Sequence, residues 1–209
     1  MALAAALGAM LVVLALTLSR SGFAGATVGL IVLTWGCLDS SRSRRQRLAI
    51  LCTEACLASL LLTGAVTLLP KGASAEMLDP ALPQVDSFGA RKEIWASASA
   101  MIAAAPLNGI GLGQFDHQID AHFPSVNFAR DASFFHAHSI YLQTALDLGI
   151  PGALGWLYLI GTFFRRCRQL ARADSGEARA IGLGMAAAMV AFLSFGITDA
   201  IALGARGDS

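Results

Sequence analysis

The sequence has little charge for its length. Aspartate, glutamate, lysine and arginine make up 14% of the 209 residues, whereas a soluble domain usually carries about 25%. Hydrophobic residues make up 56% of the chain and gather in long runs. These proportions exclude an ordinary soluble domain and indicate a membrane protein.

Motifs for metal-dependent and dinucleotide-dependent chemistry are also missing. The four cysteines show no CxxC spacing and fall in or beside apolar runs, where a cysteine is most often a small packing residue. No HExxH motif is present. The run of Gly109, Gly111 and Gly113 follows no predicted strand, so it predicts a sharp backbone turn rather than a dinucleotide site.

Five apolar segments are predicted to be membrane-spanning helices. A helix needs about 20 apolar residues to cross the hydrocarbon core. The first run has no basic region before it and is followed closely by a second, which favours a helical hairpin over a signal peptide. The predicted spans are residues 2–18, 23–38, about 48–69, about 138–164 and about 178–203.

Two arginine-rich segments orient these spans. DSSRSRRQR at 39–47 connects the second and third spans, and RRCRQLAR at 165–172 connects the fourth and fifth. Because short cytoplasmic loops are enriched in arginine, both segments are predicted to be cytoplasmic loops. The polar turn at 19–22, the stretch 70–137 and the C-terminal tail then face the extracytoplasmic side.

We therefore expect an all-α polytopic membrane protein of one domain. Residues 1–69 would form three spans, 70–137 a large extracytoplasmic loop with short amphipathic helices, and 138–209 two spans and a tail. One loop helix is expected from about Ser87 to Ala104, because its apolar residues recur at helical spacing and Pro106 then stops it.

The extracytoplasmic stretch also holds the polar side chains that could gather around a substrate. His138 stands out because it lies where the loop meets the mouth of a span, and polar groups at that depth are commonly functional. The histidines and carboxylates invite a metal site, but their spacing matches no metal-binding motif, and a loop-structuring role is the better interpretation for several of them. From Arg91 to His138 the chain holds three aspartates and all four of its histidines: Asp116, His117, Asp120, His122, Asp131, His136 and His138.

Four short motifs follow one another in an order that is typical of one family. They are SRSG at 19–22, ARKEIW at 90–95, PLNGIGLGQF at 106–115 and HAHSIYLQTALDLGIPG at 136–152. In this order they resemble the C-terminal half of the O-antigen ligase and polymerase family, which are membrane glycosyltransferases. Two features depart from the family pattern: Ser139 replaces the usual Asn after the histidine, and family members are longer. The chain is therefore expected to be part of a longer family fold.

The resemblance implies transfer of a glycan from a polyprenyl-pyrophosphate carrier to a hydroxyl of lipid A-core, at the periplasmic face of a bacterial inner membrane. A repeat-unit polymerase and a protein O-oligosaccharyltransferase remain alternatives, as does an inactive fragment. A transporter or scaffold is a further alternative. However, a transporter should place charges in mid-membrane, whereas most charges here lie at span ends and in the loop. Membrane lipids are expected partners, and nucleic acid is not.

The resemblance also implies roles for particular residues. Arg20 and Arg91 are expected to bind the pyrophosphate and stabilise it as it leaves, because a guanidinium group matches phosphate oxygens bidentately. His138 is expected to act as the general base that deprotonates the acceptor hydroxyl, because it is the histidine that directly precedes the SIYLQ segment; His136 is the alternative base. Because the arginines can replace a divalent ion, we expect an inverting transfer without metal or other cofactor. Further substrate contacts are expected from His136, Tyr141 and Gln143.

Overall fold

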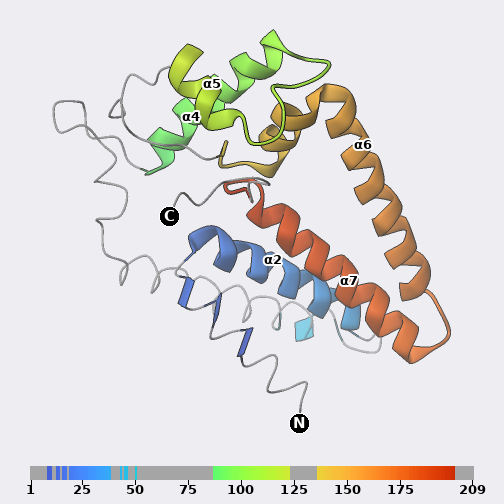
Figure 1. Cartoon of the computed structure of the whole chain (residues 1–209). Coiled ribbons are helices and arrows are strands. Elements are labelled where there is room, and N and C mark those ends of the chain that lie inside the picture. Colours follow the sequence, from blue (N-terminus) through green and yellow to red (C-terminus); the bar gives the residue numbers. More distant parts are fainter. Residues whose placement is uncertain are drawn as a thin grey trace. The chain divides into compact units, whose positions relative to one another are not determined.

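The secondary structure that the computed structural model describes is helical (Figure 1). This confirms the predicted all-α class for the described part of the chain. The described residues are 9–10, 13–14, 16–17, 19–38, 43, 45–46, 50, 87–122 and 136–200. The helices within these ranges are α2 (Arg20–Cys37), α4 (Ser87–Ala104), α5 (Phe115–His122), α6 (Ile140–Ala171) and α7 (Gly176–Phe195).

The chain divides into two compact units. Unit 1 comprises residues 1–69 and 163–195, and unit 2 comprises residues 70–162 and 196–209. Helix α6 therefore begins in unit 2 and ends in unit 1.

In unit 1, α2 and α7 pack against each other through small residues. Gly25 and Gly29 of α2 are buried, and a Cβ atom added to Gly25 would lie 2.6 Å from the carbonyl oxygen of Ala191 in α7. Small residues allow two helix backbones to approach closely, and such contacts are typical of helices that associate within a membrane.

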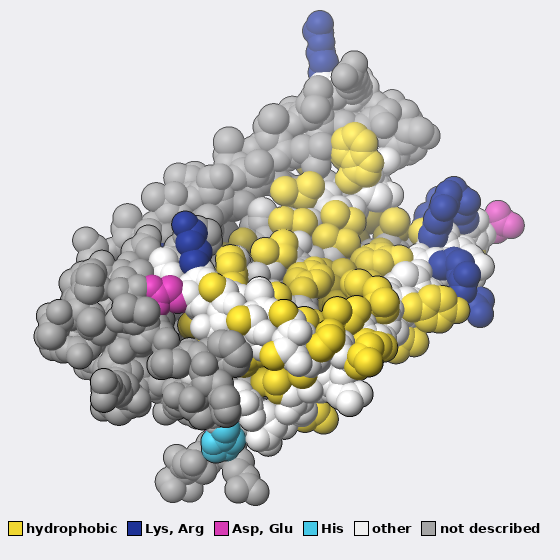
Figure 2. Space-filling model, turned by 90° about the horizontal axis from the view of Figure 1, so that it is seen from above, with side chains coloured by type: hydrophobic (Ala, Val, Ile, Leu, Met, Phe, Trp, Pro, Cys, Tyr) yellow, Lys and Arg dark blue, Asp and Glu magenta, His cyan; other side chains and the backbone are white. Residues whose placement is uncertain are grey.

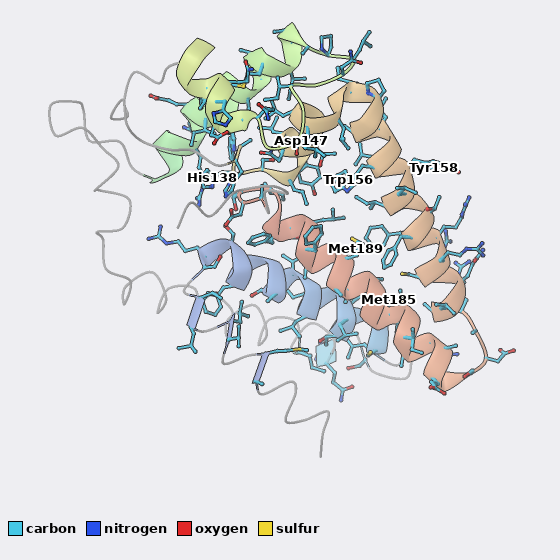
Figure 3. The ribbon with its side chains drawn as sticks, viewed as in Figure 1. His138, Asp147, Trp156, Tyr158, Met185 and Met189 are labelled. Carbon is cyan, nitrogen blue, oxygen red and sulfur yellow. The ribbon has the colours of Figure 1, made fainter. Side chains whose placement is uncertain are left out.

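Two described helices, α6 and α7, are long and apolar enough to cross a membrane. Both expose large apolar side chains, and Tyr158 of α6 points away from its helix (Figure 3). Figure 2 shows hydrophobic side chains gathered on the face in view. Exposed apolar surface on helices of this length suits contact with lipid tails. These helices agree with the fourth and fifth predicted spans, whereas nearly all of the third predicted span, 48–69, lies outside the described residues.

The predicted turn at 19–22 is wrong, because α2 already begins at Arg20. Ser19 is the N-cap of this helix, and its Oγ accepts a hydrogen bond from the Gly22 N–H at 3.0 Å. A serine in this position pairs one of the N–H groups that a helix start leaves free. The SRSG motif is therefore a helix cap.

Two further boundaries around the predicted fourth and fifth spans are also wrong. The RRCRQLAR segment lies almost entirely in α6, which ends only at Ala171, because arginine, glutamine and leucine are good helix formers. Helix α7 ends at Phe195 instead of near Leu203, and Gly196 follows it. The Gly196 carbonyl oxygen accepts a hydrogen bond from the Ile140 N–H at 2.9 Å, so this backbone pairs with the start of α6.

Two predictions about the loop are confirmed. Helix α4 spans Ser87–Ala104, as its periodicity and Pro106 indicated. Gly109, Gly111 and Gly113 have φ values of +67°, +95° and +67°, which are left-handed conformations that favour glycine. The segment between α4 and α5 is therefore the sharp turn that its glycines predicted.

The glycine turn forms backbone hydrogen bonds with residues around a break in α6. Gly149, with φ +71° and ψ +176°, interrupts the helix and is soon followed by Pro151. The Ile110 N–H donates to the Leu146 carbonyl oxygen at 2.7 Å, and the Ile150 N–H donates to the Pro106 carbonyl oxygen at 2.8 Å. Backbone groups around the break thus find partners in the turn. This interlock holds the first turns of α6 against the end of α4.

Apolar side chains fill the space within this arrangement. The buried cluster draws on α4, α5, the segment before α6 and α6 itself. Its members are Ile94, Ala98, Met101, Phe115, Ile119, Ala137 and Leu146.

Replacing Gly109 with alanine should destabilise unit 2. A Cβ there would meet the Leu146 carbonyl oxygen and lie 2.7 Å from the Gly149 nitrogen, and neither backbone atom can rotate away. The left-handed conformation by itself costs an L residue about 1–2 kcal/mol. We therefore expect a lower Tm than that of wild type in thermal unfolding of the detergent-solubilised protein.

The matched control for this substitution is Gly155→Ala in α6. A Cβ at Gly155 would meet no atom of the described residues within 4 Å, so this variant should unfold at the wild-type temperature or above it. Equal Tm values for the two variants would contradict the interlock.

Candidate functional site

A cluster of polar side chains lies at the start of α6 in unit 2 (Figure 3). His136 and His138 stand on the segment that precedes α6, and Asp199 stands on the segment that follows α7. The backbone hydrogen bond between Ile140 and Gly196 joins these two segments. We call His136, His138 and Asp199 the histidine–aspartate cluster.

The three side chains of this cluster are in close proximity. The His138 Nδ1 lies 3.7 Å from the Asp199 Oδ1, which is within ion-pair range but longer than a hydrogen bond. The two imidazole rings meet edge to face, with their centroids 4.3 Å apart. The His138 N–H donates to the His136 Nδ1 at 3.2 Å. Each residue therefore turns a polar atom toward the same small volume.

One polar atom of the cluster is buried without a partner. The His138 side chain is 31% exposed, yet its Nδ1 is buried and has no hydrogen-bond partner among the described residues. A buried polar group that lacks a partner costs free energy, so such an atom calls for a functional explanation.

The backbone at His138 is strained. Its φ of +46° makes it the one non-glycine residue with a positive φ among the described residues. Residues in this region of conformational space cluster at functional sites, where the surrounding structure holds them in place. The Trp95 indole Nε1–H of α4 donates to the His138 carbonyl oxygen at 3.3 Å and helps to hold this conformation.

A buried hydrogen-bond network supports the segment that holds His136 and His138. The Gln143 Oε1 accepts from the Ala137 N–H at 2.9 Å, and the Gln143 Nε2 donates to the Asp147 Oδ1 at 2.8 Å. Asp147 also accepts a hydrogen bond from the Gly113 backbone. Gln143 and Asp147 are buried, so the network links the histidine segment to α6 and the glycine turn.

The cluster combines a neutral imidazole with an ionised carboxylate. Burial lowers the pKa of His136, and the charges of His138 and Arg91 act in the same direction, against the charge of Asp199. Burial alone would raise the pKa of Asp199. The adjacent His138 ring, the Ala200 N–H and the charge of His136 outweigh burial and lower this pKa overall. Near neutral pH, His136 is therefore uncharged and Asp199 is charged.

The remaining predicted site residues differ in where they lie. Arg91 stands in α4 of unit 2, close enough for its charge to act on His136. Tyr141 lies in the first turn of α6 and packs edge to face on Trp156, with ring centroids 5.8 Å apart. Arg20 begins α2 in unit 1, the unit that does not contain the cluster.

Two of the other predicted carboxylates and histidines, Asp116 and His117, lie beside each other in α5. His117 is 75% exposed, and its Nε2 lies 4.0 Å from the Asp116 Oδ1. The side chains of Asp120 and His122 lie outside the described residues. Asp116 and His117 therefore form a local pair in which the histidine is exposed.

Sequence reasoning missed Asp199 as a member of the site. The apolar run from Ala178 to Leu203 predicted a helix through this position. The glycine at 196 was the available signal, because glycine is strongly enriched just after the last residue of a helix. A helix end there frees Asp199 to lie on irregular backbone beside the histidines.

Comparison with known proteins identifies the family. The sequence model of the O-antigen ligase family matches residues 5–157, which is more than half of the chain and contains all four motifs. A comparison with curated proteins gave no match. The family and the two long apolar helices together make this a membrane protein of the O-antigen ligase and polymerase type, with a glycosyltransferase-like activity. The chain belongs to the O-antigen ligase family.

Proposed function

We propose that this protein transfers a glycan from a polyprenyl-pyrophosphate carrier to a hydroxyl group of lipid A-core. Family membership supports the glycosyltransferase class. The observation that carries the proposal is the strained, partly exposed His138, whose buried Nδ1 faces the carboxylate of Asp199. This arrangement prepares an imidazole to accept a proton.

In the proposed reaction His138 is the general base. The Asp199 carboxylate favours the tautomer that carries hydrogen on Nδ1, which leaves a lone pair on Nε2. Nε2 takes the proton of the acceptor hydroxyl as its oxygen bonds to the anomeric carbon of the donor sugar. The distance of 3.7 Å should shorten when substrate binds, because catalytic hydrogen bonds are often long in free enzymes.

In this proposal, arginine side chains bind and stabilise the pyrophosphate leaving group. The bond between the anomeric carbon and the pyrophosphate oxygen breaks, and its electron pair leaves with the carrier. Arg91 lies close enough to affect the charge state of His136, and its guanidinium can form a bidentate pair with phosphate oxygens. Arg20 is proposed as a second phosphate contact on the family resemblance. Attack opposite the leaving group inverts the anomeric centre, and the arginine charges take the place of a divalent ion.

The other site residues take supporting roles. Gln143 is buried, and both ends of its amide are bonded within the protein, which favours positioning of the histidine segment over direct contact with substrate. His136 and the partly exposed Tyr141 are proposed to contact the glycan or its acceptor. We place the site on the periplasmic face of a bacterial inner membrane, in a chain with five spans.

The surface glycan profile of cells lacking this gene tests the function. We expect finished long chains to accumulate on the lipid carrier while lipid A-core stays bare, and the wild-type gene should restore the normal profile. Single repeat units that reach the acceptor but never grow would instead indicate a repeat-unit polymerase. A profile that does not change on deletion would contradict both functions.

A further inference from the structure

We propose that the histidine–aspartate cluster binds a transition-metal ion of the Zn²⁺ class, and that the bound ion blocks glycan transfer. Binding itself depends only on the geometry of unit 2. The blocking of transfer rests on the proposed function of His138.

The cluster supplies the kinds of ligand that zinc takes in proteins. One ligand atom from each of His136, His138 and Asp199 lies within 4.8 Å of the others. Two imidazole nitrogens and one carboxylate oxygen suit Zn²⁺, whereas Mg²⁺ and Ca²⁺ prefer oxygen ligands alone. Bonds of about 2.0–2.2 Å in a tetrahedral site place ligand atoms about 3.4 Å apart, so the side chains would need to close by up to about 1.5 Å.

The buried Nδ1 of His138 points to a ligand in the same place. Its Nδ1 is buried, faces Asp199 and has no hydrogen-bond partner among the described residues. A bound cation would satisfy this atom and share the Asp199 carboxylate. If the ion binds Nδ1 of His136, this atom can no longer accept the 3.2 Å hydrogen bond from the His138 N–H, whereas binding through Nε2 leaves that hydrogen bond intact.

Local charges favour reversible binding of the ion over tight, permanent binding. The carboxylate of Asp199 offsets part of the charge of the ion. Arg91 places a positive charge near His136 and opposes binding of a cation. We therefore expect an ion that a chelator removes easily.

Occupancy of this site and catalysis exclude each other for a chemical reason. When Nδ1 of His138 binds a metal, the single proton of the neutral ring moves to Nε2. That nitrogen then has no lone pair for the proton of the acceptor hydroxyl. The ion also separates Asp199 from the ring that it orients. Transfer should therefore stop while the ion is bound and resume when it leaves.

Co²⁺ added to the purified full chain in detergent tests binding, because it is a spectroscopic substitute for Zn²⁺. Wild type should give the visible absorption of tetrahedral Co²⁺ at one equivalent, and Zn²⁺ should displace it. The His136→Gln variant loses one ligand. Loss of a residue that only supports a ligand typically lowers metal affinity by about 10–100-fold, so the affinity of this variant for Co²⁺ should fall by at least that factor. The control His117→Gln should bind as wild type does, because this exposed histidine lies outside the cluster.

Glycan-transfer assays with added Zn²⁺ test whether the bound ion blocks transfer. Zn²⁺ should inhibit wild type and His117→Gln alike, and EDTA should restore the rate. Absence of a Co²⁺ spectrum in wild type, or an unchanged spectrum in His136→Gln, would overturn the site. A requirement of transfer for the metal would overturn inhibition. Metal binding by a protein without transferase activity would support the site but contradict the proposed function. Glycan transfer that Zn²⁺ does not inhibit would support the proposed function but overturn the blocking of transfer by the ion.

Discussion

Replacing His138 with glutamine should lower kcat of glycan transfer by about 10²–10⁴-fold, which is the contribution typical of a positioned general base. Glutamine keeps a polar side chain of similar reach but cannot accept the proton of a hydroxyl group near neutral pH. Donor binding should change little, because the proposed phosphate contacts come from arginines. Steady-state kinetics with a lipid-linked donor and a purified acceptor would measure the change in kcat and the change in KM for the donor separately.

The control for this substitution is the same change at another histidine. His117 is 75% exposed and outside the cluster, so His117→Gln should retain the wild-type kcat. The far-UV circular dichroism of both variants should match wild type, because neither residue belongs to the buried apolar cluster. A His138→Gln variant with kcat close to wild type would exclude this residue as the base.

Asp199→Asn should distinguish positioning from structural support. Asparagine fills nearly the same volume but lacks the charge that favours the Nδ1–H tautomer of His138. We expect kcat to fall by about 10–100-fold with KM unchanged, a smaller loss than removal of the base itself. Asp199→Glu should recover part of the rate, since it restores the carboxylate. An equal loss in both variants would indicate a structural role for Asp199.

Arg91→Lys should lower kcat/KM by about 10–100-fold even though the positive charge remains. A hydrogen bond to a charged group contributes about 1.5–3 kcal/mol, and a lysine ammonium cannot reproduce the planar bidentate pairing of a guanidinium with phosphate oxygens. Arg91 acts electrostatically on His136, so the lost contact is expected beside the reacting bond. The effect should fall mainly on kcat if the contact strengthens as the leaving group gains charge.

The matched control is the same substitution at an arginine that is distant from Arg91 in the sequence. Arg165 is exposed near the end of α6 and is not part of the proposed site, so Arg165→Lys should transfer at the wild-type rate. Full activity of Arg91→Lys would contradict the pyrophosphate assignment. A similar loss in both variants would indicate a general effect of lysine on the fold or on membrane insertion.

Local sequence signals were sufficient for much of unit 2. The apolar periodicity of residues 87–104 and the stop at Pro106 predicted α4 with the bounds that the structure has. The glycines at 109, 111 and 113 predicted a turn, and their positive φ values explain why glycine is needed there. These features depend on backbone preferences of a few neighbouring residues, which sequence records directly.

Helix ends within apolar runs were harder to predict. The run after Ala178 continues beyond Phe195, yet α7 stops there, and α6 is broken at Gly149 within a run predicted to be continuous. Composition alone does not show these interruptions, because the same residues suit either a helix or an apolar loop. Pairing of the exposed backbone with distant segments decides between them, as the hydrogen bond from Ile140 to Gly196 shows.

The sequence by itself determined that this is a helical membrane protein of the O-antigen ligase family, with His138 and Arg91 as candidate site residues. Only the tertiary structure brought Asp199 to within 3.7 Å of the buried His138 Nδ1, which has no hydrogen-bond partner among the described residues. The physical reason is that composition, periodicity and turn preferences are local, whereas a pair of side chains from the segments before α6 and after α7 meets only when the backbone of both segments is paired.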